Sequence, residues 1–257
     1  AIVLPNSLKS ALVPWFANIP RRTGWRGEWR YGLLNDLRTL DADQYPQMVQ
    51  RFAALALDAG SRLAESLPRP RLEVDDGQVA RLRQALSLEE GRSTMALCPG
   101  AEFGEAKCWP PGHYAALAQC YLDRGWQVLL LGSAKDRAAT GAVREALGAG
   151  SACLDLAGDT TLSEAIDLLS MVDAVVTNDS GLMHIAAALQ RPLVAIYGAT
   201  SPLFTPPQGD RVACRVSTIE CAPCFQRTCP LGHHRCMREI LPGQVIAELD
   251  ALLAGKR

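Results

Sequence analysis

Short apolar runs alternate with amphipathic stretches along most of the chain. After residue 92, runs of strand length occur at 95–98, 127–131, 174–177 and 193–197, and the segments between them repeat apolar residues at helical spacing. This alternation predicts an α/β fold with a doubly wound, parallel sheet. Right-handed crossovers would bring the loops after the strands to one edge of that sheet, where ligands bind.

Local signals mark where several of the helices begin. Pro110-Pro111 suits the first turn of a helix that ends near Gly125. Thr161 and Glu164 fit a capping box that opens a helix to about residue 171. Further helices are expected over 136–147, 181–189 and 244–253.

The first 92 residues give a weaker pattern. Strands are predicted at 1–4 and 22–25, and helices at 7–17, 46–65 and 79–86. Two short strands do not easily form an independent sheet. We therefore interpret 1–92 as the remainder of an N-terminal α/β domain whose first strands precede Ala1, and 93–257 as a second α/β domain. The final helix could pack back on the first domain.

Composition excludes several classes of protein. The chain is 48% hydrophobic and 21% charged with a net charge of −1, so its overall charge does not favour nucleic acid. No apolar run approaches the ~18–20 residues needed to span a bilayer, and the N-terminus does not resemble a signal peptide. Nine cysteines, an odd number scattered through predicted elements, favour a reducing cytoplasm over a secreted disulfide scaffold.

The most informative motif runs from Val176 to His184, where an apolar strand leads through Asp-Ser-Gly into a helix. The first amides of that helix, at Ser180, Gly181 and Leu182, would form a phosphate site. Asp179 would accept hydrogen bonds from sugar hydroxyls, and His184 would face the same cleft one turn later. Alternatively, Asp179 or Ser180 only caps the helix and His184 is a core histidine.

A second motif, residues 99–110, follows another strand of the same predicted sheet. Gly100 and Gly104 would let the backbone approach a ligand closely, and Lys107 would supply a charge for a diphosphate. The alternative is a surface loop with a solvated lysine. The nicotinamide fingerprint G-x-G-x-x-G and the P-loop are both absent, which argues against dehydrogenases and NTPases.

Six segments together resemble the glycosyltransferase family that includes the lipopolysaccharide heptosyltransferases, and the resemblance covers nearly the whole chain. They are Leu4–Ser7, Arg22–Glu28, Tyr31–Asp36, Gly100–Gly104 with Lys107 and Trp109-Pro110, Leu131–Asp136 and Asn178–His184.

The resemblance implies a GT-B fold, in which two Rossmann-like domains flank the active site and the C-terminal one holds the nucleotide sugar. By that analogy Lys107 and Asp179 are catalytic: Lys107 and the amides after Asp179 bind the diphosphate, and Asp179 contacts the heptose. Glu102 and Phe103 would line the phosphate and sugar site, and Thr160 would lie near the adenine. The ribose contact stays open among Ser133, Lys135 and Asp136.

The implied reaction is an inverting transfer of L-glycero-D-manno-heptose from ADP-heptose to the inner core of lipopolysaccharide, with no cofactor. The acceptor would be lipid A–Kdo–heptose, met in the cytoplasm at the inner membrane surface. The family's general base is an aspartate in the first loop of the N-terminal domain, and nothing here matches that loop. This chain is therefore expected to bind donor but to turn over poorly. The basic loop from Arg21 to Arg30 could face the anionic acceptor or be a solvated surface.

Cys221, Cys224, Cys229 and Cys236 lie close together in sequence, with His233 and His234 among them. Four thiolates could hold zinc, but the spacing departs from the usual paired C-x2-C repeat, so reduced thiols in a loop are the alternative and no metal ligand is assigned. The cluster motivates a competing class, a zinc-stapled interaction module without chemistry. Another GT-B enzyme, such as a hexosyltransferase or an epimerase, is a third interpretation.

Overall fold

The computed structural model describes residues 1–148 and 152–255, and the chain divides into two compact units. The first unit is Ala1–Pro68 with Leu203–Pro206, and the second is Arg69–Pro202 with Pro207–Arg257. The division therefore falls at Pro68 rather than at residue 92. Helix α3 (Asp76–Ala85) accounts for the difference, because Leu82, Leu86 and the preceding Val74 pack against the core of the second unit.

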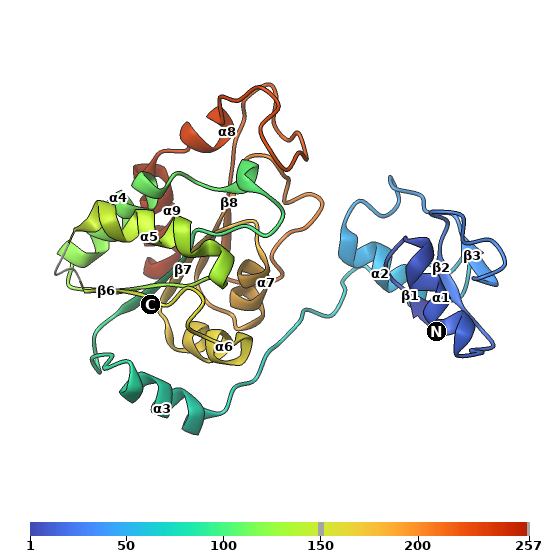
Figure 1. Cartoon of the computed structure of the whole chain (residues 1–257), viewed down its shortest axis with the longest axis horizontal. Helices are drawn as coiled ribbons and strands as arrows, with labels where there is room; N and C mark the ends of the chain where they lie inside the picture. The colour runs from blue at the N-terminus through green and yellow to red at the C-terminus, as the bar shows by residue number, and fades with distance from the viewer. Residues whose placement is uncertain (149–151, 256–257) are drawn as a thin grey trace. The chain divides into compact units, whose positions relative to one another are not determined.

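The second unit is built on a six-stranded parallel sheet (Figure 1). Its strands are β4 (Thr94–Cys98), β5 (Gln127–Leu130), β6 (Cys153–Asp155), β7 (Ala174–Asn178), β8 (Leu193–Tyr197) and β9 (Val212–Val216). They lie in the order β6-β5-β4-β7-β8-β9. The order reverses between β4 and β7, so the loops that follow these two strands diverge and leave a crevice at the carboxyl edge of the sheet.

Helices cover both faces of this sheet. On one face, α4 (Pro111–Asp123), α5 (Arg137–Leu147) and α9 (Pro242–Ala254) share a core with Met95 and Leu97 of β4. On the other face, α3, α6 (Leu162–Met171) and α7 (Gly181–Ala188) share a core with Ala96 and Cys98. Successive strand residues point to opposite faces, so the fully buried run at 94–98 serves both layers.

The first unit contains β1 (Ile2–Val3), α1 (Leu8–Phe16), β2 (Thr23–Trp25), β3 (Asp36–Arg38) and α2 (Met48–Ala56). Its three strands are parallel and lie in the order β1-β2-β3 (Figure 1). The Asp36 carboxylate accepts hydrogen bonds from Arg38, Arg21 and Thr23. The bond from Arg38 contributes most to holding the pKa of Asp36 well below its usual range.

Most of the predicted elements are confirmed, with local corrections. Ser7 caps α1, and the Thr161–Glu164 capping box opens α6. The helix predicted over 46–65 was too long, since α2 ends at Ala56 before the turn at 58–60. The final helix, α9, packs against α4, β8 and β9 within the second unit. Strands β3, β6 and β9, the 3-10 segments η1 (Glu105–Lys107) and η2 (Ala134–Asp136) and the short α8 (Arg235–Arg238) were not predicted.

No helix among the described residues is both long and apolar enough to cross a membrane.

Candidate donor-binding site

The loops after β4 and β7 meet at a buried ion pair. The Lys107 ammonium lies 2.6 Å from Oδ2 of Asp179, and the two side chains are only 13% and 7% exposed. The same carboxylate oxygen accepts a 2.7 Å hydrogen bond from the Thr200 hydroxyl, which follows β8. Three loops of one sheet edge therefore converge on Asp179 through its Oδ2 atom.

Asn178, the last residue of β7, holds the loop after β4 in position. Its Oδ1 accepts hydrogen bonds from the Trp109 amide and the Tyr114 hydroxyl, each 3.0 Å long. Its Nδ2 donates to the carbonyls of Pro99 at 2.6 Å and Gly100 at 3.4 Å. Because Asn178 is fully buried, these bonds replace water that cannot reach the loop backbone. They fix both ends of the segment that carries Lys107.

Helix α7 starts directly beside the ion pair. The Ser180 hydroxyl caps the helix by accepting a bond from the Met183 amide, and Ser180 Oγ lies 3.0 Å from Thr177 Oγ1. The positive end of the helix dipole and its first amides favour an anion at this position. With Lys107 at hand, the corner between β4 and β7 is suited to a phosphate group.

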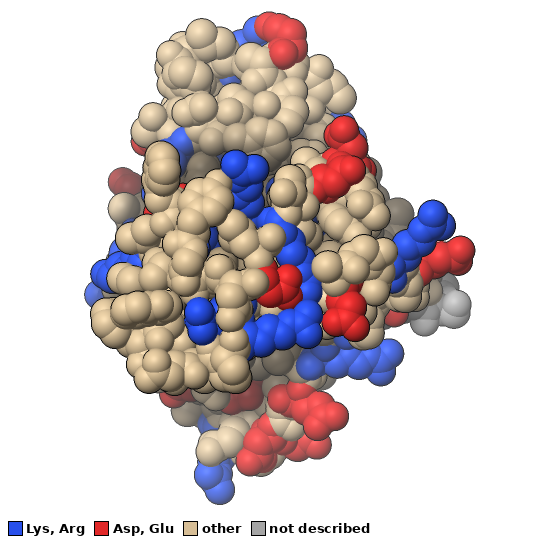
Figure 2. All heavy atoms as spheres, turned by 90° about the vertical axis from the view of Figure 1, so that its right-hand side faces the viewer, with Lys and Arg blue, Asp and Glu red and all other residues tan. Residues whose placement is uncertain are grey.

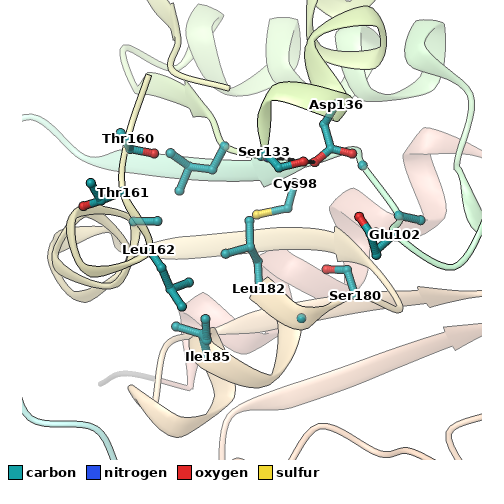
Figure 3. A pocket seen from close by; sticks show the side chains of 16 residues that line it. Cys98, Glu102, Ser133, Asp136, Thr160, Thr161, Leu162, Ser180, Leu182 and Ile185 are labelled. Atoms are coloured by element: carbon teal, nitrogen blue, oxygen red, sulfur yellow. Dashed lines mark hydrogen bonds between the residues drawn. The ribbon is translucent and has the colours of Figure 1, made fainter. Parts of the chain in front are cut away.

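A cavity of about 440 Å³ opens beside this corner, a volume within the range of small-molecule sites. It is elongated: Thr160, Thr161 and Leu162 lie at one end, and Glu102 and Ser180 lie at the other (Figure 3). Apolar side chains form much of its lining, including Leu131, Leu162, Leu182 and Ile185. The cavity thus offers an apolar slot that leads to the anion-binding helix start.

Five of the nine predicted site residues line this cavity: Glu102, Thr160, Ser180, Gly181 and Leu182. Lys107 and Asp179 do not line it, but their ion pair adjoins Ser180 along the chain. Phe103 and His184 also lie outside the lining. The His184 side chain is solvent-exposed, although crowding by neighbouring atoms partly desolvates it and lowers its pKa, against an opposing effect of the Asp179 charge.

The sequence left the ribose contact open among three residues of the loop after β5, and the structure shows where each of their side chains lies. Ser133 and Asp136 line the cavity, and the Asp136 carboxylate accepts bonds from the Ser133 amide at 2.7 Å and hydroxyl at 2.8 Å. Lys135 instead pairs with Glu102 at 2.6 Å, and both side chains are about three-quarters exposed. The hydrogen bond from Lys135 lowers the pKa of Glu102. Of the three candidates for the ribose contact, Ser133 and Asp136 line the cavity, and Lys135 is not part of its lining.

Both glycines of the 99–110 loop pack closely against neighbouring loops. A Cβ on Gly100 would overlap the Asp136 carboxylate, and a Cβ on Gly104 would overlap the backbone of Arg227. Gly104 also has φ of 153°, a conformation that L side chains rarely adopt. Gly100 also lines the cavity, so its backbone is open to a ligand there, whereas Gly104 is not part of the lining.

Two site residues were missed by sequence reasoning. Thr200 was not singled out from the sequence, because its bond to Asp179 joins two loops that only the fold brings together. Asn178 was part of the quoted motif, but no role was given to it. Its position as a polar residue ending an apolar strand was the available signal.

The cysteine cluster does not show a preformed metal site. Cys221, Cys224, Cys229 and Cys236 are free thiols that line a small cavity with His233. Within residues 1–148 and 152–255, no three or more His, Cys, Asp or Glu side chains are arranged to hold a metal ion. Amide groups from His234 and its neighbours lower the pKa of Cys229, whereas burial raises that of Cys236.

The predicted basic loop of the first unit does not form one basic face. Arg21 precedes β2 and pairs with Asp36 and Asp58, whereas Arg26 and Arg30 follow β2. Arg30 is buried and its guanidinium donates to the backbone carbonyl of Pro5 at 2.6 Å. Figure 2 shows a face on which basic and acidic side chains lie interspersed. Most of these arginines therefore have structural partners, and Arg26 stays exposed.

A parallel sheet with this strand order, an elongated apolar cavity at its switch point and a lysine beside a helix start together define a nucleotide-binding α/β protein. The profile of glycosyltransferase family 9 (heptosyltransferase) matches residues 1–235. The chain belongs to this family.

Relatives of the chain share most of its length. It is 49% identical over 260 residues to lipopolysaccharide heptosyltransferase 2 of Escherichia coli K12, covering 98% of this chain and 75% of that protein. Identity to the Salmonella typhimurium protein of the same name is 48% over 261 residues, covering 99% and 75%.

Solved structures agree with this assignment. The E. coli ADP-heptose lipopolysaccharide heptosyltransferase II superposes with a TM-score of 0.90 at 48% identity, covering 100% of this chain and 76% of that one. A family 9 glycosyltransferase from Veillonella parvula gives a TM-score of 0.80 at 18% identity, covering 98% and 73%, and this likeness supports the fold alone. The GT-B type of α/β fold expected from the sequence is confirmed.

Proposed function

We propose that the chain binds ADP-L-glycero-D-manno-heptose and takes part in its transfer to the inner core of lipopolysaccharide with inversion at the anomeric carbon. The observation that carries the proposal is the Lys107–Asp179 pair at the start of α7, next to a cavity of nucleoside size. The two heptosyltransferase 2 proteins that cover nearly all of the chain support the choice of heptose.

The donor fits the site in one direction. Its adenine would occupy the end formed by Thr160 and Leu162, and its ribose would lie near Asp136. The diphosphate would then reach the first amides of α7 and the Lys107 ammonium. Asp179 would direct Oδ1 at hydroxyls of the heptose, since Oδ2 is engaged by Lys107 and Thr200.

In the transfer step, a hydroxyl oxygen of the acceptor bonds to the anomeric carbon as the bond from that carbon to the β-phosphate oxygen breaks. The electron pair leaves with ADP, and the acceptor proton passes to a general base. Negative charge grows on the diphosphate, where Lys107 and the helix start stabilise it. The described residues therefore act on the donor and on its leaving group.

The acceptor of the proposed reaction, lipid A–Kdo–heptose, is anchored in a membrane. We place the encounter at the cytoplasmic face of the inner membrane, with the protein bound peripherally. The loop after β2 supports this, since Trp29 and Tyr31 are exposed and the Arg26 guanidinium lies over the Tyr31 ring. Co-sedimentation with vesicles that contain the lipid acceptor tests the proposal; equal recovery with acceptor-free neutral vesicles would argue against it.

Calorimetric titration with ADP, ADP-heptose and NAD tests the donor assignment. We expect binding of ADP and ADP-heptose but not of NAD, with tighter binding of the nucleotide sugar. In Asp179→Asn, which keeps the shape of the side chain, the additional affinity due to heptose should disappear while ADP still binds. Folded protein that binds neither adenine nucleotide contradicts the proposal.

An enzyme that uses a different nucleotide sugar is the second candidate. ADP-glucose and UDP-glucose binding as tightly as ADP-heptose would favour a hexosyltransferase.

A further inference from the structure

The segment that carries Lys107 packs against Arg227, which is more than a hundred positions away along the chain. We call residues 102–107 the phosphate loop and residues 221–236 the cysteine segment. The amide of Ala106 donates a 3.1 Å hydrogen bond to the carbonyl of Arg227. The Arg227 guanidinium donates in turn to the carbonyl of Phe103 at 3.3 Å. Gly104 lies so close to the Arg227 backbone that a Cβ there would overlap it.

The ring of Phe103 lies between two cations. The Lys107 ammonium is 4.8 Å from the ring centroid, and the Arg227 guanidinium carbon is 5.0 Å from it. Each cation is attracted by the ring quadrupole, although the two cations repel one another. The ring therefore links the positions of Arg227 and Lys107 without direct contact between them.

The cysteine segment is itself fixed against the donor domain. Cys221 and Cys224 precede Arg227, and Cys229 and Cys236 follow it; all four line one small cavity together with Ala106 of the phosphate loop. Cys236 is buried in the core that contains α4 and α9. Because Cys236 fixes the cysteine segment to this core, the Arg227 backbone is held in place. Its exposed side chain can then hold the phosphate loop through Phe103.

We propose that Arg227 is a positioning residue that presents Lys107 to the diphosphate of the donor by holding Phe103 in place. Asp179 directs the Lys107 ammonium from one side, and the Phe103 ring directs it from another. The inference rests on the proposed function, because it assumes that Lys107 meets a diphosphate. By this inference the cysteine segment takes part in donor binding. It does so through Arg227, which lies outside both the 99–110 and the 176–184 motifs.

Calorimetric titration of the full chain with adenosine and with ADP tests whether Arg227 positions Lys107. A residue that only stabilises the fold of the site would affect the binding of both ligands. In Arg227→Ala we expect ADP affinity to fall about five- to tenfold, the scale of one exposed cation–ring contact together with one hydrogen bond. Adenosine, which has no phosphate, should bind within about twofold of the wild type by the same scale. Arg227→Lys, which keeps the charge over the ring, should recover part of the loss. Arg238→Ala, an exposed arginine of α8 in the adjoining part of the chain, is the charge-matched control.

A double-mutant cycle with Phe103→Leu tests the route. If Arg227 acts through the ring, Arg227→Ala should have little further effect on ADP affinity in the Phe103→Leu background. Unchanged ADP affinity in Arg227→Ala, an equal loss for adenosine and ADP, or full additivity in the cycle would each overturn the inference. Failure of the wild-type chain to bind ADP would instead remove the proposed function itself.

Discussion

Asn178 offers a direct test of how the donor site is held together. Replacing it with Ala removes bonds to Trp109, Tyr114 and Pro99, each 3.0 Å or shorter, and a longer one to Gly100. At a net ~0.5–1.5 kcal/mol for each of the three short bonds, the free energy of unfolding should fall by about 3 kcal/mol. Since ~1 kcal/mol shifts the midpoint by ~2–4 °C in a unit of this size, the loss corresponds to about 6–12 °C.

Thermal unfolding followed by circular dichroism measures this shift. Gln119→Ala is the matched control, because the Gln119 amide is exposed on α4 and donates to Asp123 on the same helix. The control should change the free energy of unfolding by less than ~0.5 kcal/mol. A shift of Asn178→Ala no larger than that of the control would refute the view that Asn178 holds the loop.

Asn178→Asp adds a test in which the direction of the change in stability with pH is defined. The carboxylate keeps acceptor atoms for Trp109 and Tyr114 but cannot donate to Pro99, and burial raises its pKa above the unfolded value. A carboxyl group with a raised folded-state pKa destabilises the fold as it ionises. Stability should therefore be greatest below about pH 4, near the unfolded pKa, and decrease as pH rises through the folded-state value. A variant whose stability relative to wild type does not change over this range would contradict a buried, water-free position.

Further predictions concern the ion pair and its neighbours. Lys107→Met should weaken ADP binding by about 10- to 100-fold, the scale of one charge-assisted hydrogen bond, and leave adenosine binding unchanged in calorimetry; equal losses for both ligands would contradict a phosphate contact. Thr200→Val removes the 2.7 Å bond to Asp179 and should reduce the extra affinity for ADP-heptose over ADP, while Thr200→Ser retains it. His184 has a lowered pKa, chiefly from desolvation, so its contribution to stability is present above the unfolded value of about 6.5 and is lost as pH falls through the lower folded-state pKa. Urea unfolding of His184→Gln between pH 5 and 8 should show a flatter profile than wild type.

The sequence predicted the second unit well because its signals are local. Apolar runs such as 128–131 are continuous and fully buried, and proline or capping pairs mark the starts of α4 and α6. Short or half-exposed strands carry no such signal. β6 is three residues long with Leu154 exposed, and β9 lies at the edge of the sheet with intermediate burial. Pairing with a neighbouring strand, rather than local preference, defines these two.

The same contrast applies to the donor site. A lysine in a glycine-containing loop and an Asp-Ser-Gly helix start were recognisable by type, and the structure brings Lys107 and Asp179 together. Thr200 and Arg227 were not recognisable, since each acts on a residue more than twenty positions away along the chain. The boundary between the units was also hidden, because α3 has a weak apolar pattern and belongs to the second unit by contact with its core.

The two ends of the elongated cavity are formed by loops that lie in different parts of the sequence. Its end at residues 160–162, where we propose that the base binds, follows β6, whereas the proposed phosphate end uses residues that follow β4 and β7. Insertions or exchanges in the first set need not disturb the contacts of Asn178, Lys107 and Asp179. Under the proposed donor orientation, substitutions at 160–162 should change base preference and leave the phosphate contacts intact, provided that Thr161 keeps the capping box with Glu164 that opens α6. For engineering, the proposed donor site therefore combines a phosphate corner held in place by Asn178 with a base-side end that can be varied separately.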